Sequence, residues 1–334
     1  MIALRYGDPV FSRIIGKCAI CWLFAVAVCA GCVSAPSPRT PDNAGRLPDT
    51  PFVIDSRLID KPVFVFPKAP HGKPPVLLLH EMPGLSPETI AYAEMLSRDF
   101  TVYVPLLFGD VEMKSMFKGM LAYAFNGDWD ETAAGGFQSR RITRWLCAVL
   151  TKINEHHPSQ PVGIIGMCLT GDLPLALAAV AHDPHLRPNV HAVVLAQPTL
   201  PITSVLFGQE RLGIPDDEYH AAIDRVNQGA LKVYAVHFKD DWRSRHAKIE
   251  RLKRDLRRGF CDGTIDNSRE HLIPGEAKGS VIHSGAHSSL VGELGHDDTT
   301  TDAVNFRRQE VVKFLVNQQP LPPRWDSECR TVPF

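Results

Sequence analysis

Short apolar runs alternate along the chain with longer segments in which apolar residues recur at helical spacing. The run at 76–79 reads Val-Leu-Leu-Leu and is apolar on both faces. Such runs are typical of strands in a parallel sheet that is covered by helices on both sides. The alternation therefore predicts an α/β fold with a mostly parallel central sheet and helices on both faces.

The pattern places the elements as follows. We expect strands at 63–66, 76–80, 101–104, 162–165, 192–195, 232–236 and 280–282. We expect helices at 87–98, 130–153, 172–181, 216–227, 244–258 and 302–317. Residues 106–128 interrupt this rhythm with a segment rich in Phe and Met, which is either a cap over a site or ordinary core packing.

The N-terminus has a different character. Basic residues precede an apolar run at 18–30, which is the pattern of a secretory signal. The run is shorter than the ~20 apolar residues of a comfortable membrane-spanning helix. It ends in Ala-Gly-Cys32, which resembles the lipobox where bacterial lipoproteins are cleaved and lipidated, although Cys29 replaces the usual leucine. Ordinary signal cleavage nearby and an uncleaved anchor are the alternatives.

These features predict the division of the chain. Residues 1–31 are expected to be a lipoprotein-type signal peptide, 32–51 a flexible tether, 52–318 the folded domain and 319–334 a C-terminal tail. The protein would then be exported and held at the cell envelope by a lipid on Cys32, facing the periplasm or the exterior. In an oxidising compartment Cys261 and Cys329 could pair, although the spacing alone does not require it.

Charge and composition exclude several functions. The formal net charge of −1 gives no support for nucleic-acid binding. His80-Glu81 does not begin a His-Glu-x-x-His zinc motif, because Gly84 occupies the last position. The sequence has no glycine-rich loop of the kind that cradles phosphates. We therefore expect neither a metal nor a cofactor.

One strand–turn–helix segment carries a candidate nucleophile. The expected strand at 162–165 leads into Gly166-Met-Cys168-Leu-Thr170-Gly171, and a helix is expected directly afterwards. This is the setting of a nucleophile elbow, with cysteine in place of the more usual serine. Thr170 occupies the position of the usual second glycine. Taken alone, a cysteine at a helix start is more often a small core residue.

Other strand ends also carry reactive groups. Glu81 follows the strand at 76–80, Asp240 and Asp241 follow the strand at 232–236, and His287 follows the strand at 280–282. Ligands bind at the carboxyl ends of strands in such sheets. The chain order of nucleophile, acid and histidine is that of α/β hydrolases. Each residue alone would have an ordinary structural explanation, but together they predict a Cys-Asp-His triad.

The sequence resembles the dienelactone hydrolase family, over roughly residues 64–315. The resemblance rests on His-Glu-Met-Pro-Gly at 80–84, Gly-Met-Cys-Leu-Thr-Gly at 166–171 and Gly-Ala-His-Ser at 285–288. It implies an α/β-hydrolase fold and a triad of Cys168, Asp240 and His287. The family cleaves esters or lactones through a thioester intermediate.

The same resemblance implies roles for neighbouring residues. Glu81 would hydrogen-bond the resting thiol, and the backbone N–H groups of Met82 and Leu169 would form the oxyanion hole. Asp240 fits the family's acid position best, because Trp242 then matches an aromatic position. Asp241 stays open as the acid, since His237 stands where the family has glycine.

One departure concerns the substrate. Family members that act on dienelactone carry an arginine four residues after the triad histidine, and this chain has Val291 there. The resemblance therefore does not extend to the family's anionic lactone, and small or medium esters or lactones are the expected substrates. The alternatives are an acyl-transfer enzyme, a non-catalytic binding protein of the cell envelope, and a thiol redox sensor built on Cys168.

Overall fold

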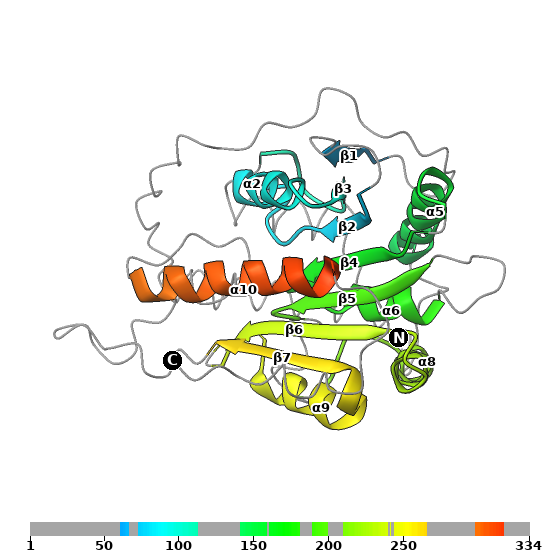
Figure 1. The fold of residues 1–334 in the computed structure, drawn as a ribbon, viewed down its shortest axis with the longest axis vertical. Helices are drawn as coiled ribbons and strands as arrows, with labels where there is room; N and C mark the ends of the chain where they lie inside the picture. The colour runs from blue at the N-terminus through cyan, green and yellow to red at the C-terminus, as the bar shows by residue number, and fades with distance from the viewer. Residues whose placement is uncertain are drawn as a thin grey trace, which may run out of the picture.

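The computed structural model describes residues 61–66, 73–112, 141–158, 160–180, 189–199, 210–239, 241, 244–265 and 298–316. Within them, seven strands form one twisted sheet, shown in Figure 1. The strands are β1 (Val63–Phe66), β2 (Pro75–Leu79), β3 (Thr101–Pro105), β4 (Val162–Met167), β5 (Val190–Ala196), β6 (Lys232–Phe238) and β7 (Phe260–Ile265). Their order across the sheet is β1-β3-β2-β4-β5-β6-β7.

The sheet is mostly parallel, as predicted. Strand β1 pairs antiparallel with β3, and every other neighbouring pair is parallel. All residues of the central strands β2 and β4 are buried, so their continuous apolar sequences reflect burial on both faces. The carboxyl ends of β2, β4, β5 and β6 therefore lie next to one another along one edge of the sheet.

Helices cover both faces of this sheet. They are α2 (Pro87–Leu96), α5 (Arg141–His156), α6 (Leu173–Val180), α8 (Asp216–Asn227), α9 (His246–Leu256) and α10 (Asp298–Val316). Helices α5, α6, α8 and α9 pack into one apolar core, while α2 and α10 pack into the other. Two short 3₁₀ helices, η1 (Cys168–Thr170) and η2 (Arg257–Gly259), connect elements. Packing in these two cores fixes the sheet in place, including the edge that carries the candidate residues.

Most expected elements among the described residues occur close to their predicted bounds, although α5 begins at Arg141 and one strand was not predicted. Strand β7 is Phe260–Ile265, which was not expected, whereas 280–282 lies outside the described residues. Asp262 and Gly263 disfavour strand formation in isolation. A Cβ on Gly263 would lie 2.7 Å from the hydroxyl oxygen of Tyr234, so close packing on β6 requires glycine there.

The structure bears on two predictions about the chain's termini and cysteines. No helix among the described residues has the length and apolar character needed to cross a membrane. Residues 1–51 and 319–334 lie outside the described residues, so the predicted signal, tether and tail stay predictions. Cys261 is disulfide-bonded, while Cys147 and Cys168 are free thiols. The partner of Cys261 lies outside the described residues, and Cys329 stays the predicted one.

Candidate active site

Cys168 lies at the tight turn between β4 and the helical segment that follows it. Strand β4 ends at Met167, and Cys168 begins η1 with a backbone φ of 52°. A positive φ is uncommon for residues other than glycine. Residues with such strained backbones are found mainly at functional sites. The strand–turn–helix geometry expected for a nucleophile elbow is therefore present at the predicted position.

The glycines on either side of Cys168 are needed for this turn. A Cβ on Gly166 would lie 2.6 Å from Pro174 Cδ and closer still to the Thr170 carbonyl oxygen. A Cβ on Gly171 would lie 2.7 Å from Pro198 Cα. Contacts this short force the backbone to move. The two small residues thus allow the turn to pack against both α6 and the segment after β5.

Thr170 fits the position where a second glycine was expected. Its hydroxyl oxygen accepts a hydrogen bond from Met167 N at 3.0 Å. The hydroxyl also lies 3.1 Å from the carbonyl oxygen of Leu79 and 3.2 Å from that of His80. Its single proton serves one acceptor at a time. Thr170 therefore ties the nucleophile turn to the end of β2, a role that the sequence motif did not indicate.

The backbone and the sulfur of Cys168 both contact the segment after β5. The Cys168 carbonyl oxygen accepts hydrogen bonds from Gly171 N and Thr199 N, each at 3.0 Å. The Cys168 sulfur lies 3.8 Å from Thr199 Oγ1. Cys168 as a whole residue is partly exposed. Sequence reasoning missed Thr199, because its contact joins segments that are distant in the chain.

Glu81 follows β2 and is buried beside the end of β5. Its Oε2 accepts a hydrogen bond from Gln197 Nε2 at 3.2 Å. Gln197 is fully buried and has a positive φ of 36°, and its N–H donates to the Val236 carbonyl oxygen at 2.8 Å. Gln197, which follows β5, thus connects the end of β2 with β6. The contact between Glu81 and the thiol that the family resemblance implies stays a prediction.

His80 fixes the backbone next to Glu81. Leu107 N donates to His80 Nε2 at 2.9 Å, so Nδ1 carries the proton and donates to the Glu81 carbonyl oxygen at 3.0 Å. Burial lowers the pKa of His80 to about 4, which keeps the ring neutral at neutral pH. His80 therefore orients the peptide that precedes Met82, and this structural role was not expected from the sequence.

The end of β6 carries the candidate acids. Asp241 is buried, and its N–H donates to the Phe238 carbonyl oxygen at 3.1 Å. Asp240 lies outside the described residues, so the choice between the two acids stays open. Burial lowers the pKa of Lys248 on α9, and attraction to Asp172 and then to Asp241 opposes that lowering. Lys248 was not singled out by the sequence.

His237 occupies the position where the family carries glycine. It is fully buried on β6, and its Nε2 lies 2.9 Å from His246 Nδ1 on α9, with the two rings stacked. Burial, followed by the nearby His246, lowers the pKa of His237 to about 4. The imidazole of His237 packs against His246, so the structure accommodates a large side chain at position 237.

The structure thus brings several predicted residues to one sheet edge. Glu81, Met82, Cys168, Leu169 and Asp241 all follow the carboxyl ends of β2, β4 or β6. Leu169 is the second residue of η1 and is buried, while Met82 is partly exposed. Their roles as oxyanion donors stay predictions. His287, Asp240, Cys32 and Val291 lie outside the described residues.

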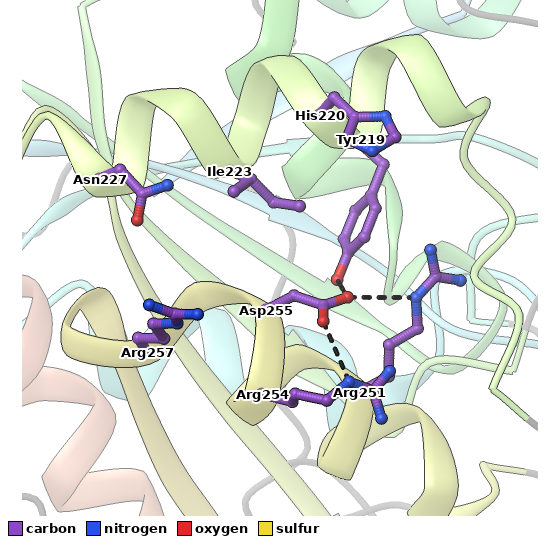
Figure 2. A pocket seen from close by; sticks show the side chains of 8 residues that line it. All are labelled: Tyr219, His220, Ile223, Asn227, Arg251, Arg254, Asp255 and Arg257. Carbon is purple, nitrogen blue, oxygen red and sulfur yellow. Dashed lines mark hydrogen bonds and ion pairs between the residues drawn. The ribbon is translucent and has the colours of Figure 1, made fainter.

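A groove elsewhere on the molecule is separate from this edge. It has a volume of about 530 Å³ and lies between α8 and α9, as Figure 2 shows. Asp255 accepts from the Tyr219 hydroxyl at 3.0 Å and lies 3.4 Å from Arg251 Nε and 3.2 Å from Arg254 Nε. The groove is lined by none of the predicted site residues. The described part of the chain also holds no cluster of three or more potential metal ligands.

Comparisons with known proteins agree with the fold. No protein-family model and no curated protein sequence matches the chain. A solved structure from Klebsiella pneumoniae subsp. pneumoniae, provisionally named a dienelactone hydrolase, is 16% identical with a TM-score of 0.50. The alignment covers 80% of this chain and 98% of that one. Est1E from Butyrivibrio proteoclasticus is 15% identical over 80% of this chain and 98% of its own, with a TM-score of 0.49.

The structural likeness shows the fold alone. The mostly parallel seven-stranded sheet with helices on both faces is that of α/β-hydrolase structures, and the predicted fold class is confirmed. At 16% identity the likeness does not extend to membership of the dienelactone hydrolase family.

Proposed function

We propose that this protein is a hydrolase that cleaves a carboxylic ester or lactone with Cys168 as its nucleophile. The observation that carries the proposal is the strained backbone of Cys168, which has a φ of 52° on a strand–turn–helix segment at the carboxyl ends of the parallel strands. Such strain persists only where surrounding structure enforces it. Here two close-packed glycines and Thr170 enforce it.

The proposed chemistry begins with proton transfer from the Cys168 thiol to His287. Asp240, or Asp241 in its place, orients the imidazole and balances its positive charge. The thiolate attacks the carbonyl carbon, and the N–H groups of Met82 and Leu169 stabilise the oxyanion. The C–O bond breaks, the leaving alkoxide takes the proton from His287, and a thioester remains. Water, deprotonated by His287, then hydrolyses the thioester and regenerates the thiol.

One feature bears on the substrate of the proposed reaction. Val291 replaces the arginine that holds an anionic lactone in the family, so we propose a neutral ester or lactone. An acyl-transfer enzyme would use the same thioester but an acceptor other than water.

A covalent adduct tests the proposal directly. After brief incubation with p-nitrophenyl acetate, mass spectrometry is expected to find an acetyl group on Cys168. Release of p-nitrophenol should vanish in Cys168→Ala, while circular dichroism stays unchanged. Cys147 is the internal control for acetylation. It is also outside any disulfide, but it is buried in α5 and should stay unmodified. Wild-type turnover by Cys168→Ala would rule out Cys168 as the nucleophile, whereas no turnover by the wild-type protein would favour a binding protein or a redox sensor.

We also propose that the enzyme is exported and anchored in the cell envelope by a lipid on Cys32. The support is the basic N-terminus, the apolar run at 18–30 and the Ala-Gly-Cys sequence that follows it. Wild-type protein expressed in a bacterium should partition into the detergent phase, and Cys32→Ala should not. An intact mass that shows an unmodified N-terminus at another residue would contradict this anchor.

A further inference from the structure

A buried lysine lies behind the nucleophile. Lys248 is the third residue of α9, and its side chain is completely buried. Its ammonium donates to the Pro198 carbonyl oxygen at 3.0 Å. Burying a charged amine is costly unless hydrogen bonds and opposite charges compensate for the loss of water. The neighbours of Lys248 must therefore compensate for the water that its ammonium loses.

The peptide group between Pro198 and Thr199 connects this lysine to Cys168. Lys248 Nζ binds the carbonyl oxygen of that peptide, and the N–H of the same peptide donates to the Cys168 carbonyl oxygen at 3.0 Å. The peptide is thus held at both ends, in a chain of hydrogen bonds whose members polarise one another. It carries Thr199, whose hydroxyl lies 3.8 Å from the Cys168 sulfur.

Opposite charges surround the ammonium. Burial lowers the pKa of Lys248 to about 8, and attraction to Asp172, Asp241 and Cys168 opposes that lowering. The amine is therefore mostly protonated at neutral pH. The lysine thus places a buried positive charge on the hydrogen-bonded path that leads to the nucleophile.

We infer that Lys248 is a positioning residue for Cys168, and that its buried positive charge fixes the peptide that orients the nucleophile. The inference deepens the proposed function and rests on Cys168 as its nucleophile. Because Lys248 is completely buried, it acts from behind the turn and does not replace the substrate-binding arginine that is missing at Val291.

Alkylation of Cys168 by iodoacetamide measures this effect without any substrate. The full-length chain is treated across pH 5–9, and the rate is followed by mass spectrometry of the peptide that contains Cys168. Lys248→Met is expected to slow alkylation at pH 7 roughly tenfold, because the peptide that orients Cys168 loses the charged group that holds its carbonyl. Lys248→Arg keeps the charge and should restore most of the rate.

Lys253→Met is the matched control, because Lys253 lies on the same helix and is exposed, 3.6 Å from Asp262. It should alkylate as wild type does. If Lys248→Met does not fold, as judged by circular dichroism, Lys248→Gln takes its place, since it keeps a donor for the Pro198 carbonyl but has no charge. A wild-type alkylation profile in the folded neutral variant overturns the inference.

The two proposals fail in distinguishable ways. If wild-type protein hydrolyses no ester while alkylation still depends on Lys248, the hydrolase proposal fails and the positioning role stands. If wild-type protein hydrolyses esters and the neutral variant keeps both its alkylation profile and its pH–rate profile for kcat, the positioning role fails and the hydrolase proposal stands.

Discussion

The turns after β4 and β5 both contain a residue with positive φ, but they are held in different ways. At the turn after β4, Cys168 is held by its own neighbours, because Gly166 and Thr170 lie within two residues of it. At the turn after β5, Gln197 is held by distant groups. Its side chain reaches Glu81, and Lys248 binds the next residue, Pro198.

The turn at Cys168 is therefore held mainly by residues close to it in the sequence. The turn at Gln197 depends on residues that only the folded chain brings near it. The first is indicated by a short motif at a strand–helix junction, although Thr170 also contacts the end of β2. The second needs β2, β5 and α9 to be assembled before its contacts exist. Gly171 joins the two, since its missing side chain leaves room for Pro198. The strain at Cys168 is therefore enforced from both sides once the sheet has formed.

The largest expected effects test whether the triad completes the locally encoded turn. His287→Ala should lower kcat for p-nitrophenyl acetate roughly 10²–10⁴-fold, because the base transfers a proton in both half-reactions. Asp240→Asn should cost a similar factor or less, through the wrong imidazole tautomer. Asp241→Asn is the internal control and should be mild.

The reverse ranking would identify Asp241 as the acid. Asp241 then would combine catalysis with its attraction to Lys248. Full activity in all three variants would refute the triad and leave Cys168 without its expected base.

The next effect tests the packing of the turn after β4. Gly166→Ala places a methyl group 2.6 Å from Pro174 Cδ and still nearer a backbone oxygen that cannot rotate away. We expect a loss of about 3 kcal/mol in the free energy of unfolding, at the upper end for overpacked sites, together with lower activity. Urea unfolding followed by circular dichroism measures it.

Gly229→Ala provides the control for this variant. Gly229 has a φ of 72°, and a Cβ there meets nothing within 4 Å. Its substitution should cost only the strain of the left-handed conformation, about 1 kcal/mol. A loss for Gly166→Ala no larger than that for Gly229→Ala would mean that the neighbours of Gly166 move aside at little cost.

The same contrast explains how far sequence reasoning reached. Strand β2 and the turn at Cys168 were predictable, because apolar runs and a short motif report local structure. Strand β7 was missed because its glycine is required by a contact with Tyr234 of another strand. Gln197 and Lys248 were missed for the same reason, since a glutamine and a helical lysine carry no local mark of burial. The polar support of the site is set by tertiary contacts alone.

His80 and His237 are both buried, and they differ in the kind of group that holds them. Their lowered pKa values predict that stability depends on pH. His80 is held by backbone groups, whereas His237 contacts the side chain of His246. Burial lowers both pKa values from 6.5 to about 4. The unfolded chain therefore binds more protons between these values, so stability is lost as pH falls from about 6.5 towards about 4.

Each histidine should contribute a loss of about 2 kcal/mol between pH 7 and pH 5. His80→Gln and His237→Gln should each remove their share of this pH dependence in urea unfolding. If His237→Gln unfolds as steeply with pH as wild type, its contact with His246 leaves the ring accessible to protons in the folded state.

The smallest effect tests the long-range support of the turn after β5. Gln197 Nε2 donates to the Glu81 carboxylate at 3.2 Å in a buried site. In a double-mutant cycle with Gln197→Met and Glu81→Gln, the coupling in the free energy of unfolding should be about 1.5 kcal/mol, as expected for a hydrogen bond to a charged group. Thr170→Ser, which keeps the hydroxyl, should leave this coupling unchanged. A coupling near zero would mean that Gln197 adopts its strained backbone for a reason other than Glu81, and the turn would then depend on its contact with Val236 and on Lys248 instead.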